Sequence, residues 1–464
     1  MSLTPHLFER LDPITGDEPF YVMTAFSILR DGDLDESNNY AERQYDELFP
    51  SQPLPADWRG WDRIAPEIAP HEAITERDGQ YTKHGLGLPL LIAIPFDLFG
   101  RSGAVAVILA FAVALAGQCY LLARETGASP RLAATIALAL TLTMPIVPYT
   151  HLLFPEVPAA LCLLYAFRRV AAPGNTTLQW FLAGSAIGLM PWLHQRFAPT
   201  AVVFTIFIMF RFMRDRGTRS PLAALVPVGI GGVALIALNL WLFGAPIMPS
   251  ENHDGFSGPA GTVNGTVGLL FDDKWGLLLA APLMLLAIAA IPHWWRADRA
   301  TARLAAFTIL PYLATLATYS VWWGAWGPPA RYLVPVVPLA AAPLAAWLST
   351  AAWPGRATAI VCWLAGATLT LVGLIAPQRF YHQPNELNHL IGTLDTWLGT
   401  TVADHLVAFQ TLDPSPTGHR IAAGLLGVAL IAITVVLVSY TPRSRLRLAR
   451  PVRSSPIREG SQPE

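Results

Sequence analysis

The chain has 464 residues, of which 53% are hydrophobic and only 14% are charged, and its mean hydropathy is +0.42. A soluble globular chain carries about 25% charged residues, so this composition excludes an ordinary soluble protein. The net charge of −1 conceals an acidic N-terminal region: residues 1–85 contain 17 of the 32 acidic residues and only 7 of the 31 basic ones. This imbalance argues against a nucleic-acid partner. All three cysteines lie in apolar runs and indicate neither a disulfide framework nor a metal cluster.

Apolar runs long enough to cross about 30 Å of hydrocarbon recur along the chain. They predict an all-α polytopic membrane protein with eleven transmembrane helices. The predicted spans are residues 103–123, 132–150, 155–170, 178–194, 197–213, 221–243, 276–293, 302–322, 333–351, 357–376 and 421–440.

The remaining segments complete the predicted domain organisation. Residues 1–85 form an acidic external region with short interfacial helices and the catalytic motif, and residues 86–100 form a further interfacial helix because Pro89, Pro95 and Asp97 interrupt the run. A transmembrane core over 103–376 is followed by an external loop over 377–420 and the last span. Residues 441–464 form a basic, Pro/Ser-rich cytoplasmic tail that we expect to be disordered and to contact anionic lipid headgroups.

Loop charges predict the orientation of the spans. Alternate connections and the C-terminal tail together carry 18 basic residues against five acidic ones. We therefore expect a multi-pass protein of the cytoplasmic (inner) membrane with its C-terminus in the cytoplasm and residues 1–85 outside. Eleven spans with this orientation need an external N-terminus, and residues 1–16 contain no apolar run that could carry the acidic region across. We expect a twelfth, N-terminal helix to be missing because the start codon was placed too far downstream.

Ionisable side chains near membrane depth are costly and mark functional sites by default. Here they gather on the side predicted to be external, close to span ends. The candidates are Asp17, Glu18, Lys83, His84, His151, Glu156, His194, Arg196, Lys274, Arg331 and Tyr332. An external enzyme that acts on an anionic lipid needs such a set, because carboxylates serve as bases and cations hold a phosphate.

The acidic candidates also have structural interpretations. Asp17 and Glu18 fit the start of a helix with Pro19 in its first turn. This interpretation is compatible with catalysis, because a helix N-terminus positions a carboxylate well. The run that contains Asp31, Asp33 and Asp35 follows a calcium-loop spacing, although Glu36 stands where the loop requires glycine. A divalent metal at this run and a solvated acidic turn both remain open.

The basic candidates have alternatives as well. Lys83 and His84 could serve as surface or headgroup contacts, and His194 and Arg196 as snorkelling residues at an interface. An aromatic belt accounts for the tryptophans of the run 322–326 but does not account for Arg331.

Four motifs resemble those of bacterial glycosyltransferases of the GT-C class, both in their order along the chain and in their shared position on the side predicted to be external. The nearest branch is the one related to protein O-mannosyltransferases and to the aminoarabinose transferase of lipid A. The motifs are the Asp17-Glu18 pair, the Asp31-Gly-Asp33 run, Lys83-His84-Gly-x-Gly-x-Pro and Gly327-Pro-x-x-Arg331-Tyr332. The resemblance covers the chain from Gly16 to about Leu348.

This resemblance implies the activity and the roles of the candidates. It implies an inverting hexosyl- or pentosyltransferase that moves a sugar from a polyprenyl-phosphate donor to an envelope lipid, glycan or protein. Asp17 would act as the base with Glu18 beside it, and Lys83, Arg196, Lys274 and Arg331 would hold the donor phosphate. His84, His194 and Tyr332 complete the predicted substrate-binding set. The implied chemistry requires no nucleotide, and no cofactor is needed by the sequence.

Two other classes compete with this interpretation. A transporter or flippase of lipid-linked sugars commonly has duplicated halves and charges at the bilayer midplane, whereas this sequence has no evident duplication. An envelope scaffold would have no need for cations grouped at span ends.

Overall fold

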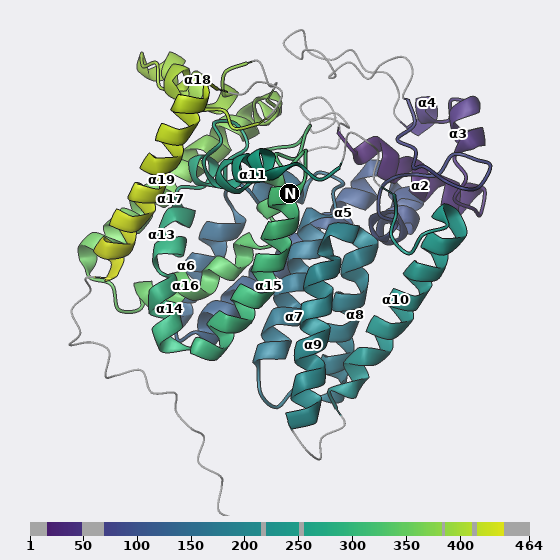
Figure 1. The fold of residues 1–464 in the computed structure, drawn as a ribbon, viewed down its shortest axis with the longest axis horizontal. Helices are drawn as coiled ribbons and strands as arrows, with labels where there is room; N and C mark the ends of the chain where they lie inside the picture. The colour runs from purple at the N-terminus through teal and green to yellow at the C-terminus, as the bar shows by residue number, and fades with distance from the viewer. Residues whose placement is uncertain are drawn as a thin grey trace, which may run out of the picture.

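A computed structural model describes residues 16–48, 69–214, 220–249, 255–382, 386–410 and 415–439. The described residues form helices joined by loops, with two isolated β-bridges, Glu72–Thr82 and Phe256–Tyr319 (Figure 1). The predicted all-α class is therefore confirmed. Residues 1–15 and 49–68 of the predicted external region, and the predicted tail over 441–464, lie outside the described residues.

Six helices are long and apolar enough to cross a membrane, which confirms a polytopic membrane protein. They lie at six of the eleven predicted spans. They are α5 (Gly87–Glu125), α9 (Ala198–Arg214, preceded by a 3-10 turn from Gln195), α10 (Leu222–Phe243), α15 (Arg299–Thr318), α17 (Trp353–Ile375) and α19 (Thr417–Ser439).

Of the other five predicted spans, 155–170 and 178–194 agree with a helix of the structure to within one residue. The predicted spans 132–150, 276–293 and 333–351 are broken into shorter helices, so these three extents were wrong. The helices there are α6 (Pro130–Thr141) with η2 (Val147–Thr150), α7 (Glu156–Ala171), α8 (Thr177–Leu193), then α12 (Leu277–Ala280), α13 (Leu283–Ala289) and α14 (Ile291–Ala297), and finally η4 (Arg331–Leu333), η5 (Val337–Ala340) and α16 (Ala341–Leu348). Prolines explain most breaks, because proline lacks an N–H donor and clashes with the preceding turn. Pro282 and Pro292 start new helices within one predicted span.

Helix α5 contains the predicted interfacial segment and the first predicted span. Its backbone leaves the helical conformation at Gly100, where φ is 59° and ψ is −153°. The segment before Gly100 and the span after it are therefore two helices with different directions. Whether the first of them lies at a membrane interface stays a prediction.

The remaining elements lie in the connections. They are α2 (Glu18–Arg30), α3 (Ser37–Ala41), α4 (Tyr45–Leu48), η3 (Gln195–Phe197), α11 (Pro259–Phe271), η6 (Pro377–Phe380), α18 (His389–Leu398) and η7 (Ala403–His405). Figure 1 shows α2, α3, α4, α11 and α18 at the same end of the helical bundle.

One large apolar core joins α2 to the bundle and contains Tyr149, Phe154 and Phe197. A smaller apolar cluster, with Phe380 and Leu390 among its members, fixes α18 to the end of α17. Most large side chains of α10 are exposed or half-buried, as a lipid-facing helix requires. Packing therefore holds the loops of one end in fixed positions, and the candidate residues lie in those loops.

Candidate active site

Asp17 is the residue before α2, and Gly16 determines how it approaches the bundle. Gly16 has a φ of 60°, a left-handed conformation that favours glycine. A Cβ atom at this position would lie 2.7 Å from the carbonyl oxygen of Trp326. The Gly-Asp sequence therefore allows the start of α2 to lie directly against the loop that precedes Arg331.

Arg331 contacts Asp17 across the longest sequence separation in the site. Its Nη2 donates to Asp17 Oδ2, its Nε donates to Glu156 Oε1 at 3.0 Å, and its Nη1 donates to the carbonyl oxygen of Gly324 at 3.2 Å. Its guanidinium also lies 4.3 Å from the centre of the Phe154 ring. All three nitrogens are thus engaged, and the side chain is 5% exposed.

The glycine-rich loop 324–327 makes room for this arginine. A Cβ atom on Gly324 would lie 3.0 Å from Arg331 Cβ, and one on Gly327 would lie 3.0 Å from Arg331 Cδ. Gly324 also has a φ of 89°, and Ala330 adopts the left-handed conformation with a φ of 57°. Ala330 is not glycine, so this conformation is strained. The loop therefore follows the arginine side chain closely.

Glu156 bridges two arginines. Its Oε1 accepts hydrogen bonds from Arg331 Nε and, at 2.7 Å, from Arg196 Nη2. Glu156 is fully buried at the start of α7, and its second oxygen bonds to no described residue. Arg196 lies over the Tyr332 ring at 4.3 Å from its centre. One carboxylate oxygen therefore holds two cations close to Asp17.

Glu18, the second predicted catalytic carboxylate, is fully buried. Its Oε1 accepts hydrogen bonds from the backbone N–H of Leu153 at 2.8 Å and from Arg101 Nη2 at 3.1 Å. This arrangement ties the start of α2 to the chain segment before α7. Glu18 therefore has a structural function, and its predicted catalytic role remains untested.

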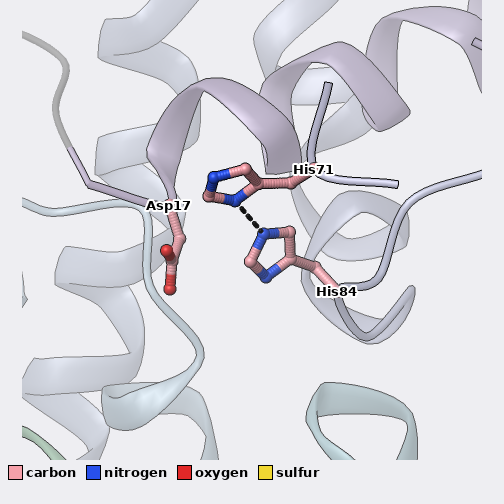
Figure 2. Close-up of side chains that lie close together, drawn as sticks. All are labelled: Asp17, His71 and His84. Carbon is pink, nitrogen blue, oxygen red and sulfur yellow. Dashed lines mark hydrogen bonds between the residues drawn. The ribbon is translucent and has the colours of Figure 1, made fainter. Parts of the chain in front are cut away.

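The Lys-His-Gly-x-Gly motif approaches the same region from α5. Cβ atoms on Gly85 and Gly87 would lie 2.4 Å and 2.7 Å from backbone atoms of Leu193, so glycine permits this close contact with the end of α8. His84 is 8% exposed and lies beside Asp17 (Figure 2). His194 is half-buried and accepts a hydrogen bond from the backbone N–H of Arg196 at 3.1 Å. The Lys83 side chain is half-buried.

His71 joins the group, although sequence reasoning missed it. His71 Nδ1 and His84 Nε2 lie 3.2 Å apart, and one ring nitrogen of each histidine and a carboxylate oxygen of Asp17 all lie within 4.8 Å of one another (Figure 2). Two imidazoles and a carboxylate are a donor set that could hold a transition metal. Asp31, Asp33 and Asp35, the predicted metal candidates, do not form such a set among the described residues.

The aspartates of that run bond within the chain instead. Asp33 Oδ1 accepts from the Ser27 hydroxyl and from a backbone N–H, and Asp35 Oδ1 accepts from Ser37 and from the backbone N–H of Gln80 at 2.9 Å. Asp31 Oδ2 accepts from Asn39 at 2.7 Å. These bonds fold the connection between α2 and α3.

The surroundings shift the pKa values of Asp17 and His84 in the same direction. Burial alone would raise the pKa of Asp17. The charge of Arg331 and its hydrogen bond lower this pKa by more than burial raises it, so the pKa lies below its ordinary range. Burial lowers the pKa of His84 to about 4. At neutral pH Asp17 is therefore an anion beside an uncharged imidazole.

Lys274 lies apart from the two arginines. Its ammonium group pairs with Asp273 at 2.9 Å in the loop after α11, and the side chain is 3% exposed. Of the predicted substrate-binding residues, Arg196, Arg331 and Tyr332 are in direct contact, and His84 lies near Asp17. Glu156 was visible in the sequence only as an acidic residue before an apolar run, and no local signal identified it as the bridge.

No protein-family model matches the sequence, and no curated protein is significantly similar to it. Among solved structures, the chain is similar to ArnT from Cupriavidus metallidurans, in a structure bound to undecaprenyl phosphate and in one of the apo state. In both comparisons the TM-score is 0.46 and the identity is 14%, over 92% of this chain and 71% of ArnT. ArnT belongs to the group of GT-C glycosyltransferases that the sequence motifs resemble.

Proposed function

We propose that this protein is a membrane glycosyltransferase that moves a sugar from a polyprenyl-phosphate donor to an acceptor hydroxyl at the outer face of the cytoplasmic membrane. The observation that carries the proposal is the buried arrangement of Asp17, Arg331, Glu156 and Arg196. It combines one anionic side chain that can accept a proton with two fixed cations that can hold a phosphate. The ArnT structure named for its bound undecaprenyl phosphate is in accord with such a donor.

The reaction follows from these groups. An acceptor hydroxyl attacks the anomeric carbon of the donor, and its proton passes to the Asp17 carboxylate. The bond between the anomeric carbon and the phosphate oxygen breaks, and its electron pair leaves with the polyprenyl phosphate. Attack from the side opposite the leaving group inverts the anomeric carbon. Arg331 and Arg196 offset the negative charge that grows on the phosphate, a contribution worth about 3 kcal/mol for each well-placed donor.

Phosphate binding also changes the basicity of the Asp17 carboxylate. In the described state, Arg331 lowers the pKa of Asp17 and makes the carboxylate a weak base. A phosphate that draws Arg331 toward itself weakens this pairing, so the carboxylate becomes more basic when the donor is in place. Base strength and donor binding are thereby coupled through one arginine.

Transport of a lipid-linked sugar is the alternative function. A transporter places its site near the middle of the membrane and closes it from both sides. The position of α2, α11 and α18 at one end of the bundle favours surface chemistry over passage (Figure 1).

The test is an assay of membranes containing the chain with a panel of radiolabelled polyprenyl-phosphate sugars. Wild type is compared with Asp17→Asn and with a control, Asp97→Asn, because Asp97 forms an exposed ion pair with Arg30 at 3.0 Å. We expect transfer by wild type and control and a loss of at least about 100-fold in Asp17→Asn. Undiminished transfer by Asp17→Asn would exclude this base. A wild type that neither binds nor consumes any donor would exclude the function.

A further inference from the structure

Three buried polar atoms without a partner lie together beside Lys274, outside the arrangement described above. Asp273 Oδ1, Trp275 Nε1 and His382 Nε2 bond to no described residue, and their side chains are at most 8% exposed. The Trp275 and His382 rings meet edge to face with centres 6.3 Å apart, and Lys274 Nζ lies 5.9 Å from the Trp275 ring centre. Buried polar atoms nearly always have partners. Three in one place indicate a group that the described residues do not supply.

The loop that carries Asp273, Lys274 and Trp275 is held by several hydrogen bonds. Asp272 Oδ1 accepts the backbone N–H groups of Lys274 and Trp275, both at 3.0 Å, and its Oδ2 accepts that of Phe409 at 2.7 Å. Asn388, at the start of α18, donates to the carbonyl oxygen of Asp273 at 2.5 Å. The orphaned atoms are therefore fixed in position by surrounding hydrogen bonds.

The hydrogen-bonding capacity of the cluster specifies its ligand. His382 Nδ1 accepts the backbone N–H of His389 at 3.3 Å, so Nε2 carries the ring proton and is a donor. Trp275 Nε1 is also a donor, and Lys274 retains donors beyond its bond to Asp273. Asp273 Oδ1 is an acceptor. The missing group must accept hydrogen bonds and donate one, as a hydroxyl group does.

Charge and space agree with a hydroxyl. Asp273 and Lys274 neutralise each other, and burial holds the pKa of His382 well below its usual range, so its ring is uncharged. An anion placed here would lack a compensating charge. Lys274, of the four cluster residues, also lines a cavity with Asn388 and Pro329 among others, and this cavity has room for a group the size of a water molecule.

The cluster is next to the reaction centre along the backbone. The N–H of Ala330 donates to the carbonyl oxygen of Trp275 at 3.1 Å, and Arg331 is the following residue. In the proposed function Arg331 holds the donor phosphate, to which the transferred sugar is directly attached. One backbone hydrogen bond therefore connects the loop of the cluster to the residue before Arg331.

We infer that Asp273, Lys274, Trp275 and His382 form a subsite that recognises one hydroxyl group of a substrate sugar and so selects which sugar is transferred. The inference rests on the proposed function and assigns its sugar specificity to this cluster. The hydroxyl belongs either to the donor sugar or to an acceptor sugar.

The experiment measures affinity and needs no turnover. The full chain in detergent is titrated with polyprenyl phosphate, with polyprenyl-phosphate sugars and with their singly deoxygenated analogues. A second arm uses methyl glycosides and their deoxy forms, with polyprenyl phosphate already bound. Trp275→Phe deletes one donor and keeps the ring. Trp363→Phe deletes the same atom from α17, where Trp363 Nε1 also bonds to no described residue, and serves as the matched control.

His382→Asn is the second test variant, because an asparagine oxygen can replace Nδ1 as acceptor for His389 while the Nε2 donor disappears. We expect wild type and Trp363→Phe to bind one sugar at least about fivefold more tightly than its deoxy analogue. In Trp275→Phe and His382→Asn the two affinities become equal. Loss of discrimination in the lipid arm assigns the donor sugar, and loss in the glycoside arm alone assigns the acceptor.

Two results overturn the subsite: no discrimination by wild type in either arm, or equal discrimination by Trp275→Phe and Trp363→Phe. A wild type that binds polyprenyl phosphate but gives either result leaves the proposed function intact. A wild type that binds no polyprenyl phosphate at all refutes the proposed function, and the inference falls with it.

Discussion

Arg331→Lys tests whether the shape of the guanidinium group, and not only its charge, builds the site. Arg331 uses Nε, Nη1 and Nη2 for three different partners: Glu156, Gly324 and Asp17. A lysine ammonium is a single nitrogen on a flexible stem and cannot reproduce a planar fork. It keeps the charge but loses at least two of the three hydrogen bonds.

The expected magnitude follows from those bonds. Hydrogen bonds to charged groups contribute about 1.5–3 kcal/mol each, so two lost bonds lower the free energy of unfolding by about 3–6 kcal/mol. Donor affinity falls as well, because a fork holds a phosphate through two parallel bonds. We expect a clearly lower midpoint of thermal unfolding in detergent and at least about a tenfold weaker affinity for polyprenyl phosphate.

Arg379→Lys is the matched control, because among the described residues Arg379 makes one hydrogen bond, to the carbonyl oxygen of Val372 at 3.2 Å. Its unfolding midpoint and donor affinity are expected to stay near those of wild type. If Arg331→Lys behaves like Arg379→Lys in both measurements, the argument from the three-way fork is wrong.

Three further predictions concern the neighbours of this arginine. Glu156→Gln leaves two buried guanidinium groups without their shared anion, so we expect the unfolding free energy in a denaturant titration to fall by about 3 kcal/mol; little change relative to Glu386→Gln, a partly exposed residue, would contradict this. Burial lowers the pKa of His84 to about 4, whereas an unfolded histidine titrates near about 6.5. The free energy of unfolding is therefore unaffected by this shift above pH about 6.5 and falls as the pH drops toward about 4, by up to about 3 kcal/mol. We expect the midpoint of thermal unfolding to depend less on pH in His84→Gln than in wild type. An equal pH dependence in both proteins would oppose the assignment. Gly327→Ala forces a Cβ to within 3.0 Å of Arg331, and the expected result is weaker donor binding with retained folding, measured by the same titration as for Arg331→Lys.

The sequence by itself determined the class of the protein and pointed to several of the residues that the structure brings together, among them Asp17, Arg196 and Arg331. Apolar runs must become helices in a membrane, since every backbone N–H and C=O group has to be satisfied within the segment. Local motifs also carried information: Gly16 before Asp17 and the glycines after His84 stand where the backbones of distant segments meet closely. These are properties of residue type, and a sequence displays them directly.

The tertiary structure decided which charges meet. Asp17 and Arg331 are separated by 314 residues, and Arg331 and Glu156 by 175. Many carboxylates and arginines were available as partners, and nothing in local sequence ranks them. Helix packing places Glu156 between Arg196 and Arg331, and it places Lys274 beside Asp273 instead. Packing also shortened several predicted spans, because prolines and close contacts can end a helix within a run that hydropathy alone reads as continuous.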